Sequence, residues 1–267
     1  MSIYSKEHEE FLKKKKKEKY LVILFQFLIL IIFIATWQIL ANLKIINTFL
    51  FSSPENIINT TIKLFKDKLL THIGVTFYET IISFLLASIL GLIVATILWW
   101  NKTIAKIVDP YLTVINSLPK VALGPLIIIW VGTSTNSIIF MALMISLIIS
   151  IINIYNAFIS TEKNYIILLK SFNATKWQIF SKVIFPSNKQ NIINAFKINI
   201  SMSLIGVIMG ELLVSKEGLG YLIMYGSQVF NINLVITSVF ILGIISYIMY
   251  YIIHIIEKKE KIKKEKS

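Results

Sequence analysis

The run YLVILFQFLILIIFIATWQILA, residues 20–41, indicates the class of fold, because it continues for 22 residues without a charged side chain. A helix of that length extends about 33 Å at roughly 1.5 Å per residue, enough to cross the hydrocarbon core of a bilayer. The run is too long for the apolar part of a cleaved signal peptide, so it predicts an uncleaved first membrane span.

The whole chain has the composition of a polytopic membrane protein. Of its 267 residues 56% are hydrophobic, and the mean hydropathy of +0.75 is too apolar for a soluble domain. All 27 basic residues are lysines at span ends and tails, so the net charge of +13 indicates membrane orientation rather than nucleic-acid binding. There is no cysteine, and His8, His72 and His254 are scattered, so we expect neither a metal site nor a cofactor.

Five further apolar runs predict an all-α bundle of about six transmembrane helices. They lie near 74–99, 107–131, 136–158, 190–214 and 232–256. The chain therefore divides into a basic tail at 1–19, a transmembrane domain at 20–256 and a second basic tail at 257–267. The lysine block of the first tail is typical of a solvated, disordered segment.

The distribution of lysines predicts the orientation of the spans. With six spans both termini lie on one side, and that side holds twenty lysines, in the two tails and in the loops near 100–106 and 161–189. The opposite side holds five. Lysine-rich loops stay in the cytoplasm. The sequence therefore predicts a multi-pass protein of the bacterial cytoplasmic (cell) membrane with both termini cytoplasmic.

The loop after the first span has the pattern of a helix of its own. Ser53-Pro54-Glu55 combines a helix N-cap, a proline at the first helical position and an acid in the first turn. Apolar residues then recur at helical spacing through residues 57–69. We expect an amphipathic helix that packs on the bundle or lies on the outer membrane surface.

The segment LLKSFNATKWQIFSKVIFP, residues 168–186, has features beyond those of an ordinary amphipathic connection. Asn173 tolerates the left-handed turn that ends many helices. The Ala-Thr-Lys-Trp-Gln run, the Val-Ile-Phe-Pro close and the spacing of Asn173 to Pro186 resemble the cytoplasmic coupling loop of ABC importer permeases, which docks into the ATP-hydrolysing subunit. That family has Glu-Ala-Ala, three residues and Gly, where this chain has Ile167-Leu168-Leu169 and Asn173. The glutamate is missing and the glycine is replaced.

Two further stretches carry the same resemblance over roughly residues 70–256. One is Asp109-Pro110-Tyr111-Leu112 followed by SLPKVALGPLIIIWVG at 117–132, and the other is GELL at 210–213 followed by EGLGYLI at 217–223. With the loop, they resemble permeases of the nitrate, sulfonate, bicarbonate and taurine importers. This implies a type I-like permease fold of six helices.

The resemblance also implies partners and site residues. The partners are an ABC ATPase subunit in two copies, a second permease copy that makes a homodimer, an extracytoplasmic substrate-binding protein and membrane lipid, with no nucleic acid. The chain itself is not an enzyme. The residues implied for the ATPase-coupling loop are Leu168, Leu169, Phe172, Asn173, Ala174, Thr175, Lys176 and Pro186.

A second group of residues is a candidate for the translocation pathway or its gate: Pro119, Lys120, Gly124, Pro125, Ser203, Gly206, Gly210 and Glu211. Prolines inside a span favour a broken helix, although a helix that simply begins after Pro119 fits equally well. An ionisable residue in a span favours a function. The alternative for each residue is a structural role: Lys120 extends its ammonium to the cytosolic membrane interface, and Glu211 hydrogen-bonds the glycine-rich turn that follows it.

The fifth span carries a face of small residues, Ala195, Asn199, Ser203, Gly206 and Gly210. Such a face favours close helix packing, either within the chain or against a second copy, with pore lining as the second interpretation.

The function predicted is that of a permease subunit of an ATP-driven importer, which moves a small solute by alternating access. No phosphate-binding G-x-x-x-x-G-K-[ST] motif occurs, so the ATPase must be a separate chain. The alternative is a secondary transporter or channel without an ATPase, which usually shows midplane ionisable groups or an internal repeat. Nitrate, sulfonates, taurine, bicarbonate and vitamin precursors such as pyrimidines or riboflavin are all compatible substrates.

Overall fold

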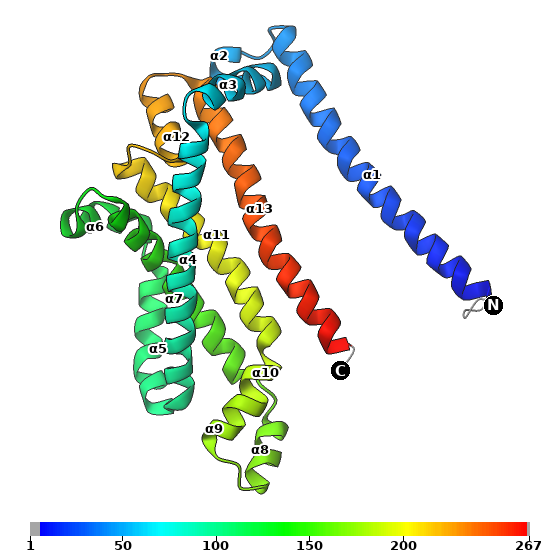
Figure 1. Cartoon of the computed structure of the whole chain (residues 1–267), viewed down its shortest axis with the longest axis vertical. Coiled ribbons are helices and arrows are strands. Elements are labelled where there is room, and N and C mark those ends of the chain that lie inside the picture. Colours follow the sequence, from blue (N-terminus) through cyan, green and yellow to red (C-terminus); the bar gives the residue numbers. More distant parts are fainter. Residues whose placement is uncertain (1–5, 266–267) are drawn as a thin grey trace.

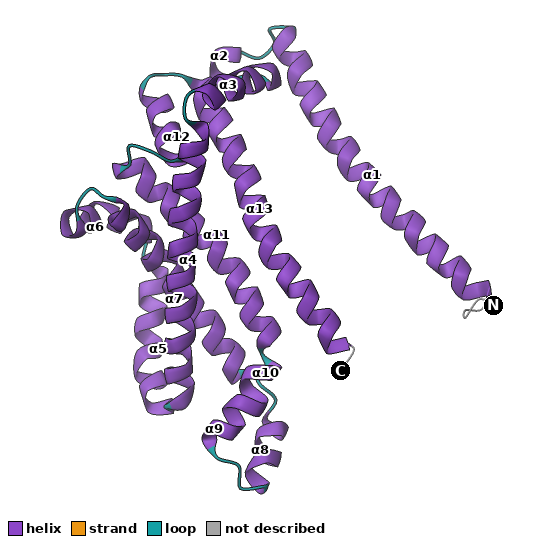
Figure 2. Ribbon diagram, in the orientation of Figure 1, coloured by secondary structure: helices purple, strands orange, loops and turns teal. Residues whose placement is uncertain are grey.

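The computed structural model describes the backbone of residues 6–265 and the side chains of residues 10–258, and the described chain is helical with short connections (Figure 1, Figure 2). The all-α prediction is therefore confirmed. The parts of the two predicted tails at residues 1–5 and 266–267 lie outside the described residues. The helices are α1 (Lys6–Asn42), α2 (Thr48–Phe51), α3 (Pro54–Lys66), α4 (Leu69–Trp100), α5 (Lys102–Ser117), a 3-10 turn (Lys120–Leu123), α6 (Gly124–Val131), α7 (Thr135–Ile159), α8 (Lys163–Ser171), α9 (Lys176–Ile179), a π-helical turn (Phe180–Ile184), α10 (Phe185–Ser187), α11 (Lys189–Val214), α12 (Leu219–Gln228) and α13 (Ile232–Glu265).

Within the described residues, five helices are long and apolar enough to cross a membrane: α1, α4, α7, α11 and α13. A sixth span exists if α5 and the segment 120–131 are taken together, but that pair is bent by 85°. The span predicted at 107–131 is therefore found as a bent pair of helices rather than one continuous helix. Leu118 has extended backbone (ψ 141°) because the ring of Pro119 disfavours helical geometry in the preceding residue. The alternative of a broken helix is the one that the structure adopts.

The core of the bundle lies where α4, α7 and α11 pack together. Small residues allow this close approach, as expected for helices in a membrane. A Cβ atom added to Gly206 of α11 would lie 2.5 Å from the Cα of Ala142 in α7, and one on Gly210 would lie 3.0 Å from the Cα of Ile138. Asn199 of the same face hydrogen-bonds the Ser88 hydroxyl of α4 at 2.8 Å.

The small-residue face of the fifth span is thus buried inside the chain, which confirms the packing interpretation. The idea that this face meets a second copy is wrong, because α7 and α4 already cover it. Pore lining by the same face finds no support, since Ala195, Asn199 and Ser203 are all buried.

Helix α1 stands apart from the bundle and joins it through α2 and α3 (Figure 1). Its most apolar stretch has no buried side chain, as expected for a helix whose neighbours are lipid or another subunit. From Lys6 onward the basic segment continues this helix, so the predicted disorder of the first tail is wrong where the structure describes it. Good helix formers such as lysine and glutamate allow the span to extend into water.

The amphipathic helix expected after the first span is α3. Ser53 caps it, its hydroxyl accepting a hydrogen bond from the Asn56 amide at 3.2 Å, and Pro54 occupies the first turn. Helix α3 packs on α13 and also contacts α1 and α4, while Ile58, Ile62 and Phe65 remain exposed. It therefore lies across one end of the bundle, the end that also carries α12 (Figure 1).

Candidate coupling site and a buried carboxyl pair

The segment 161–186 projects from the end of the bundle opposite α3 and α12 (Figure 1). The first and last described parts of the chain lie toward that same end. Helix α8 leads down to a turn at residues 172–175, and α9, the π-helical turn and α10 lead back to α11. Residues 161–186 therefore form an ordered helical hairpin, which we call the coupling loop.

The turn of the coupling loop depends on Asn173. This residue has φ +55°, in the left-handed region, as predicted from the sequence. Its amide donates to the Lys170 carbonyl at 2.9 Å, and the Ala174 amide donates to the Leu169 carbonyl at 3.0 Å. These bonds satisfy carbonyl groups that the end of α8 would otherwise leave without partners.

The return helix α9 begins with a capping box. The Thr175 hydroxyl accepts from the Gln178 amide at 3.3 Å, and the Gln178 side chain accepts from the Thr175 amide at 2.7 Å. The base of the loop is also closed, because the Asn188 side-chain amide donates to the Thr161 hydroxyl at 2.6 Å. Pro186 lies in the first turn of α10, where its missing N–H is tolerated. These contacts make the loop a defined shape.

The predicted coupling residues divide into an exposed set and a packed set. Phe172 at the tip is 75% exposed, and Leu168 is 54% exposed. Leu169 and Ala174, in contrast, pack against a buried cluster that includes Phe158 and Ile179. The loop therefore presents Phe172 and Leu168 outward, whereas the amphipathic period of α8 turns Leu169 inward.

Lys176 has a structural contact that the sequence did not reveal. Its ammonium donates to the carbonyl of Trp100 at the end of α4, and it lies 5.5 Å from the centroid of that residue's ring. A cation at a helix C-terminus is favoured by the helix dipole. The bond joins residues 76 positions apart, so no local pattern could predict it.

Aromatic rings attach the coupling loop to the ends of the spans. Phe180 lies 5.1 Å from Trp99 of α4 and 5.5 Å from Phe158 of α7, measured between ring centroids. Trp177 lies 6.2 Å from Trp100 and is itself 63% exposed. Sequence reasoning missed these residues, although Trp177 and Phe180 share one helical face at i, i+3 spacing. These ring contacts join the coupling loop to the ends of α4 and α7.

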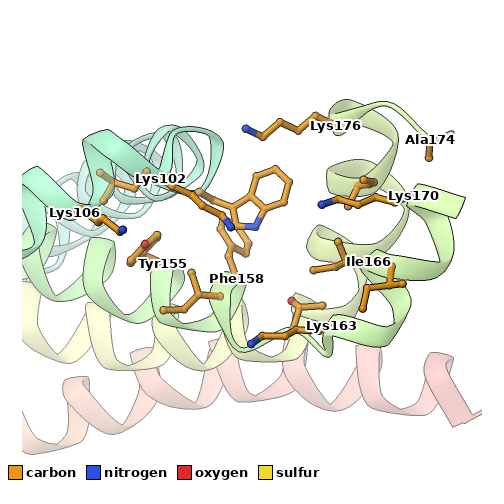
Figure 3. Close-up of a pocket in the computed structure, with 15 residues that line it drawn as sticks. Lys102, Lys106, Tyr155, Phe158, Lys163, Ile166, Lys170, Ala174 and Lys176 are labelled. Atoms are coloured by element: carbon orange, nitrogen blue, oxygen red, sulfur yellow. The ribbon is translucent and has the colours of Figure 1, made fainter.

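A cavity of about 820 Å³ opens between the coupling loop and the ends of α4, α5 and α7. Figure 3 shows lysine side chains around it, over a floor that includes Tyr155, Phe158 and Ile166. The lysines are Lys102, Lys106, Lys163, Lys170 and Lys176. Among the described side chains none of these five forms an ion pair, so this end of the molecule presents unneutralised positive charge.

The candidate pathway residues do not form one site. Pro119 and Lys120 lie at the bend between α5 and α6, where the Lys120 ammonium donates to the Asn116 carbonyl at 3.0 Å. Pro125 lies in the first turn of α6. A Cβ on Gly124 would lie 2.6 Å from Leu213 and 2.9 Å from Met141, so this glycine allows α6 to pack on α7 and α11.

Glu211 is not part of that bend. It is enclosed by the turn that follows α11. Its carboxyl accepts from the Thr76 hydroxyl and from the Gly220 amide, both at 2.6 Å. Gly218 has φ +106°, and a Cβ there would overlap the Glu211 carboxyl. The predicted hydrogen bond between Glu211 and the glycine-rich turn is confirmed.

A second carboxyl, which sequence reasoning missed, lies beside Glu211. Glu79 of α4 is fully buried, and Thr76, one turn before it on the same helix, donates to Glu211. Its position inside an apolar span was the available signal, since ionisable residues there are rare and tend to be functional.

A multi-pass helix bundle with a rigid, exposed loop fastened to its spans is the architecture of a transport subunit driven by a partner. Comparison with known proteins makes the class specific. The chain belongs to the family described as "Binding-protein-dependent transport system inner membrane component", whose model matches residues 87–262. It is a multi-pass inner-membrane protein, the permease of an ABC importer, and works with an ATPase and a binding protein. It is not catalytic itself.

Two curated relatives and one solved structure illustrate the similarity. The formylaminopyrimidine transport permease protein ThiX of Halalkalibacterium halodurans is 30% identical over 185 residues, 69% of this chain and 74% of that protein. The putative aliphatic sulfonates transport permease protein SsuC of Bacillus subtilis is 25% identical over 229 residues, 85% and 83% of the two chains. The MetNI methionine ABC transporter, in an inward-facing conformation, matches 72% of this chain and 95% of its own with a TM-score of 0.64 and 20% identity, which shows the fold.

Proposed function

We propose that this permease imports a small organic solute of the vitamin-precursor pyrimidine or aliphatic sulfonate class by alternating access. The names of two relatives, ThiX and SsuC, support these two substrate classes. The family membership argues against the alternative of a secondary transporter or channel that uses no ATPase.

The tip of the coupling loop is the proposed contact with the ATPase. The observation that carries this proposal is the exposure of Phe172, which is 75% accessible on an ordered turn. A large apolar side chain in that position is best stabilised by a partner that covers it. With Leu168 and Trp177, it forms an apolar surface that fits a hydrophobic cleft.

The rigidity of the loop supports transmission of force in this proposal. Closure of the ATPases displaces the tip, and the Lys176 bond and the Phe180 ring contacts pass the displacement to α4 and α7. Because α4, α7 and α11 are closely packed, they move as one body.

Two identical permease copies and two ATPases complete the proposed importer. The small-residue face of α11 is covered within the chain, so the second copy contacts another surface. The bent segment α5–α6 is suited to this role, since Ile129 and Trp130 are 76% and 72% exposed. Both termini and the coupling loop face the cytoplasm, as the lysine distribution indicates.

Uptake by the complete importer tests the proposed function. The permease, its ATPase and the cognate binding protein would be reconstituted in proteoliposomes, and ATP-dependent accumulation of radiolabelled formylaminopyrimidine and of a short alkanesulfonate would be measured. We expect one of the two to accumulate only with ATP and the binding protein. Failure of both to accumulate would exclude the proposed substrates, and uptake without ATP would exclude the coupled mechanism.

A further inference from the structure

Two carboxyl groups meet inside the bundle near the end that carries α3 and α12. Glu79 on α4 is 0% exposed and Glu211 on α11 is 1% exposed, and Thr76, one turn before Glu79, hydrogen-bonds Glu211, so both carboxyls lie at the same contact between α4 and α11. Two ionised carboxylates in this position would repel each other in a medium of low dielectric constant, so an additional positive charge, such as a proton, is needed at this site.

The hydrogen bonds show which of the two is the anion. Glu211 accepts from the Thr76 hydroxyl and the Gly220 amide. The Thr76 oxygen also accepts from the Leu219 amide at 2.8 Å, which leaves its own proton to donate to Glu211. Two donors aimed at one carboxyl favour its ionised form.

Glu79 has the opposite environment. Neither of its side-chain oxygens receives a hydrogen bond of normal geometry from any described group. A buried carboxylate without donors is strongly unfavourable, whereas a carboxylic acid needs an acceptor for its proton. The Glu211 carboxylate, which is bonded to Thr76 one turn before Glu79 on α4, is the acceptor that the geometry offers.

The basic groups nearby do not neutralise the pair. Among the described side chains the ion pairs are Lys197 and His254 with Glu257, all toward the other end of the bundle. His72 of α4 accepts from the Gly218 amide at 3.0 Å and stacks on Tyr221 of α12. The charged groups that act on His72 are Lys68 and Glu217, neither of which acts on Glu79. Helix α7 presents Thr135 to Glu79.

A metal ion fits the site less well than a proton. Within the described residues no group of three or more His, Cys, Asp or Glu side chains is placed to hold a metal. The nearby hydroxyls are also engaged, since Thr76 bonds Glu211 and Thr80 donates to the Thr76 carbonyl at 2.7 Å. A proton requires only one oxygen from each carboxyl.

We propose that Glu79 and Glu211 form a buried proton-binding site, in which Glu79 holds the proton and donates it to the Glu211 carboxylate. This hydrogen bond joins α4 to α11, and the contacts of Glu211 with Gly218 and Gly220 extend the connection to the turn before α12. A bound proton thus takes the place of an ion pair in closing this end of the bundle.

Infrared spectroscopy of the purified full-length protein in lipid nanodiscs tests the site without the ATPase or the substrate. We expect the unmodified protein to show the carbonyl band of a protonated carboxylic acid at neutral pH, and the band to shift slowly in D₂O because the group is buried. Glu79→Gln should abolish the band, because its amide still donates to the Glu211 carboxylate. Glu211→Gln should retain it, because the buried Glu79 remains an acid. The exposed Glu55→Gln is the control and should leave the spectrum unchanged.

Any other pattern overturns the proposal. Absence of the band from the unmodified protein would exclude a bound proton, whether or not the variants fold. Retention of the band in Glu79→Gln together with its loss in Glu211→Gln would show that Glu211, and not Glu79, holds the proton. Loss of the band on addition of millimolar Na⁺ or Ca²⁺ would identify a metal site instead.

Thermal unfolding at several pH values gives an independent readout. A proton bound only in the folded protein stabilises it at low pH, and this stabilisation is lost as the pH rises. The melting temperature of the unmodified protein and of Glu55→Gln should therefore fall more on alkalinisation than that of Glu79→Gln. An identical pH dependence in all three proteins would contradict the proposal.

Discussion

Asn173 gives the coupling loop its shape, and replacing it by valine is a quantitative test of how the loop works. Asn173 has φ +55°, a conformation that asparagine tolerates and a β-branched residue resists. Left-handed backbone costs an ordinary residue about 1–2 kcal/mol. Asn173→Val should therefore lower the equilibrium ratio of the observed turn to other loop conformations by a factor of about 5–30.

The loss should appear in binding to the ATPase rather than in folding. Residues 172–175 lie outside the packed spans, so Asn173→Val should insert normally and melt within a few degrees of the unmodified protein. The dissociation constant for the ATPase, measured by surface plasmon resonance with nanodisc-embedded permease, should rise by about 5- to 30-fold, the factor by which the turn is depopulated.

Asn173→Gly is the matched control, because glycine adopts the left-handed region without strain. It should bind the ATPase as well as the unmodified protein. Equal affinity for the valine variant would refute the argument that this turn presents the contact. Equal weakening by glycine and valine would show that the Asn173 side chain, and not the backbone conformation, is recognised.

Three further predictions concern the bundle, the orientation and the pairing of subunits. Gly206→Leu should lower the unfolding free energy by about 1–3 kcal/mol through overpacking against α7, while Gly74→Leu, with no atom within 4 Å of its added Cβ, should be nearly neutral in thermal unfolding. A single cysteine at Ser5 should resist a membrane-impermeant thiol reagent in intact cells and one at Asn59 should react; labelling of the first would reverse the orientation. A single cysteine at Trp130 should form a disulfide-linked dimer in native membranes on oxidation; its failure to form one, alongside intact transport, would exclude α6 from the interface between copies.

The helices and their local ends could be predicted because they depend on neighbouring residues. Apolar runs predicted five of the spans, since hydropathy over about 20 residues is sufficient to recognise a membrane helix. Ser53 and Pro54 identified the start of α3, and Asn173 identified the left-handed turn. The bond from Gly220 to Glu211 was also foreseeable, because only nine positions separate the two.

The features that the sequence did not reveal depend on contacts between distant segments. Pro119 predicts a break in the helix, but the packing of α6 against α7 and α11 sets the 85° bend. The bond of Lys176 to Trp100 could not be predicted, because it joins the coupling loop to the end of a span 76 positions away. The proximity of Glu79 to Glu211 could not be predicted, because a hydrophobicity pattern cannot show that α4 and α11 become neighbours.

The apolar tip of the coupling loop is best tested by measuring how much ATPase remains bound when Phe172 is shortened. Phe172→Ala removes a side chain that is 75% exposed in this chain and that the ATPase is proposed to bury, a loss of about 2 kcal/mol, or roughly 30-fold in affinity. Phe65→Ala, which changes a phenylalanine that is 58% exposed at the opposite end of the bundle, is the control. In affinity purification from membranes, the Phe172 variant should lose the ATPase and the Phe65 variant should retain it. Equal ATPase recovery with both variants, together with unchanged substrate-stimulated ATP hydrolysis, would show that the permease is coupled through a different surface.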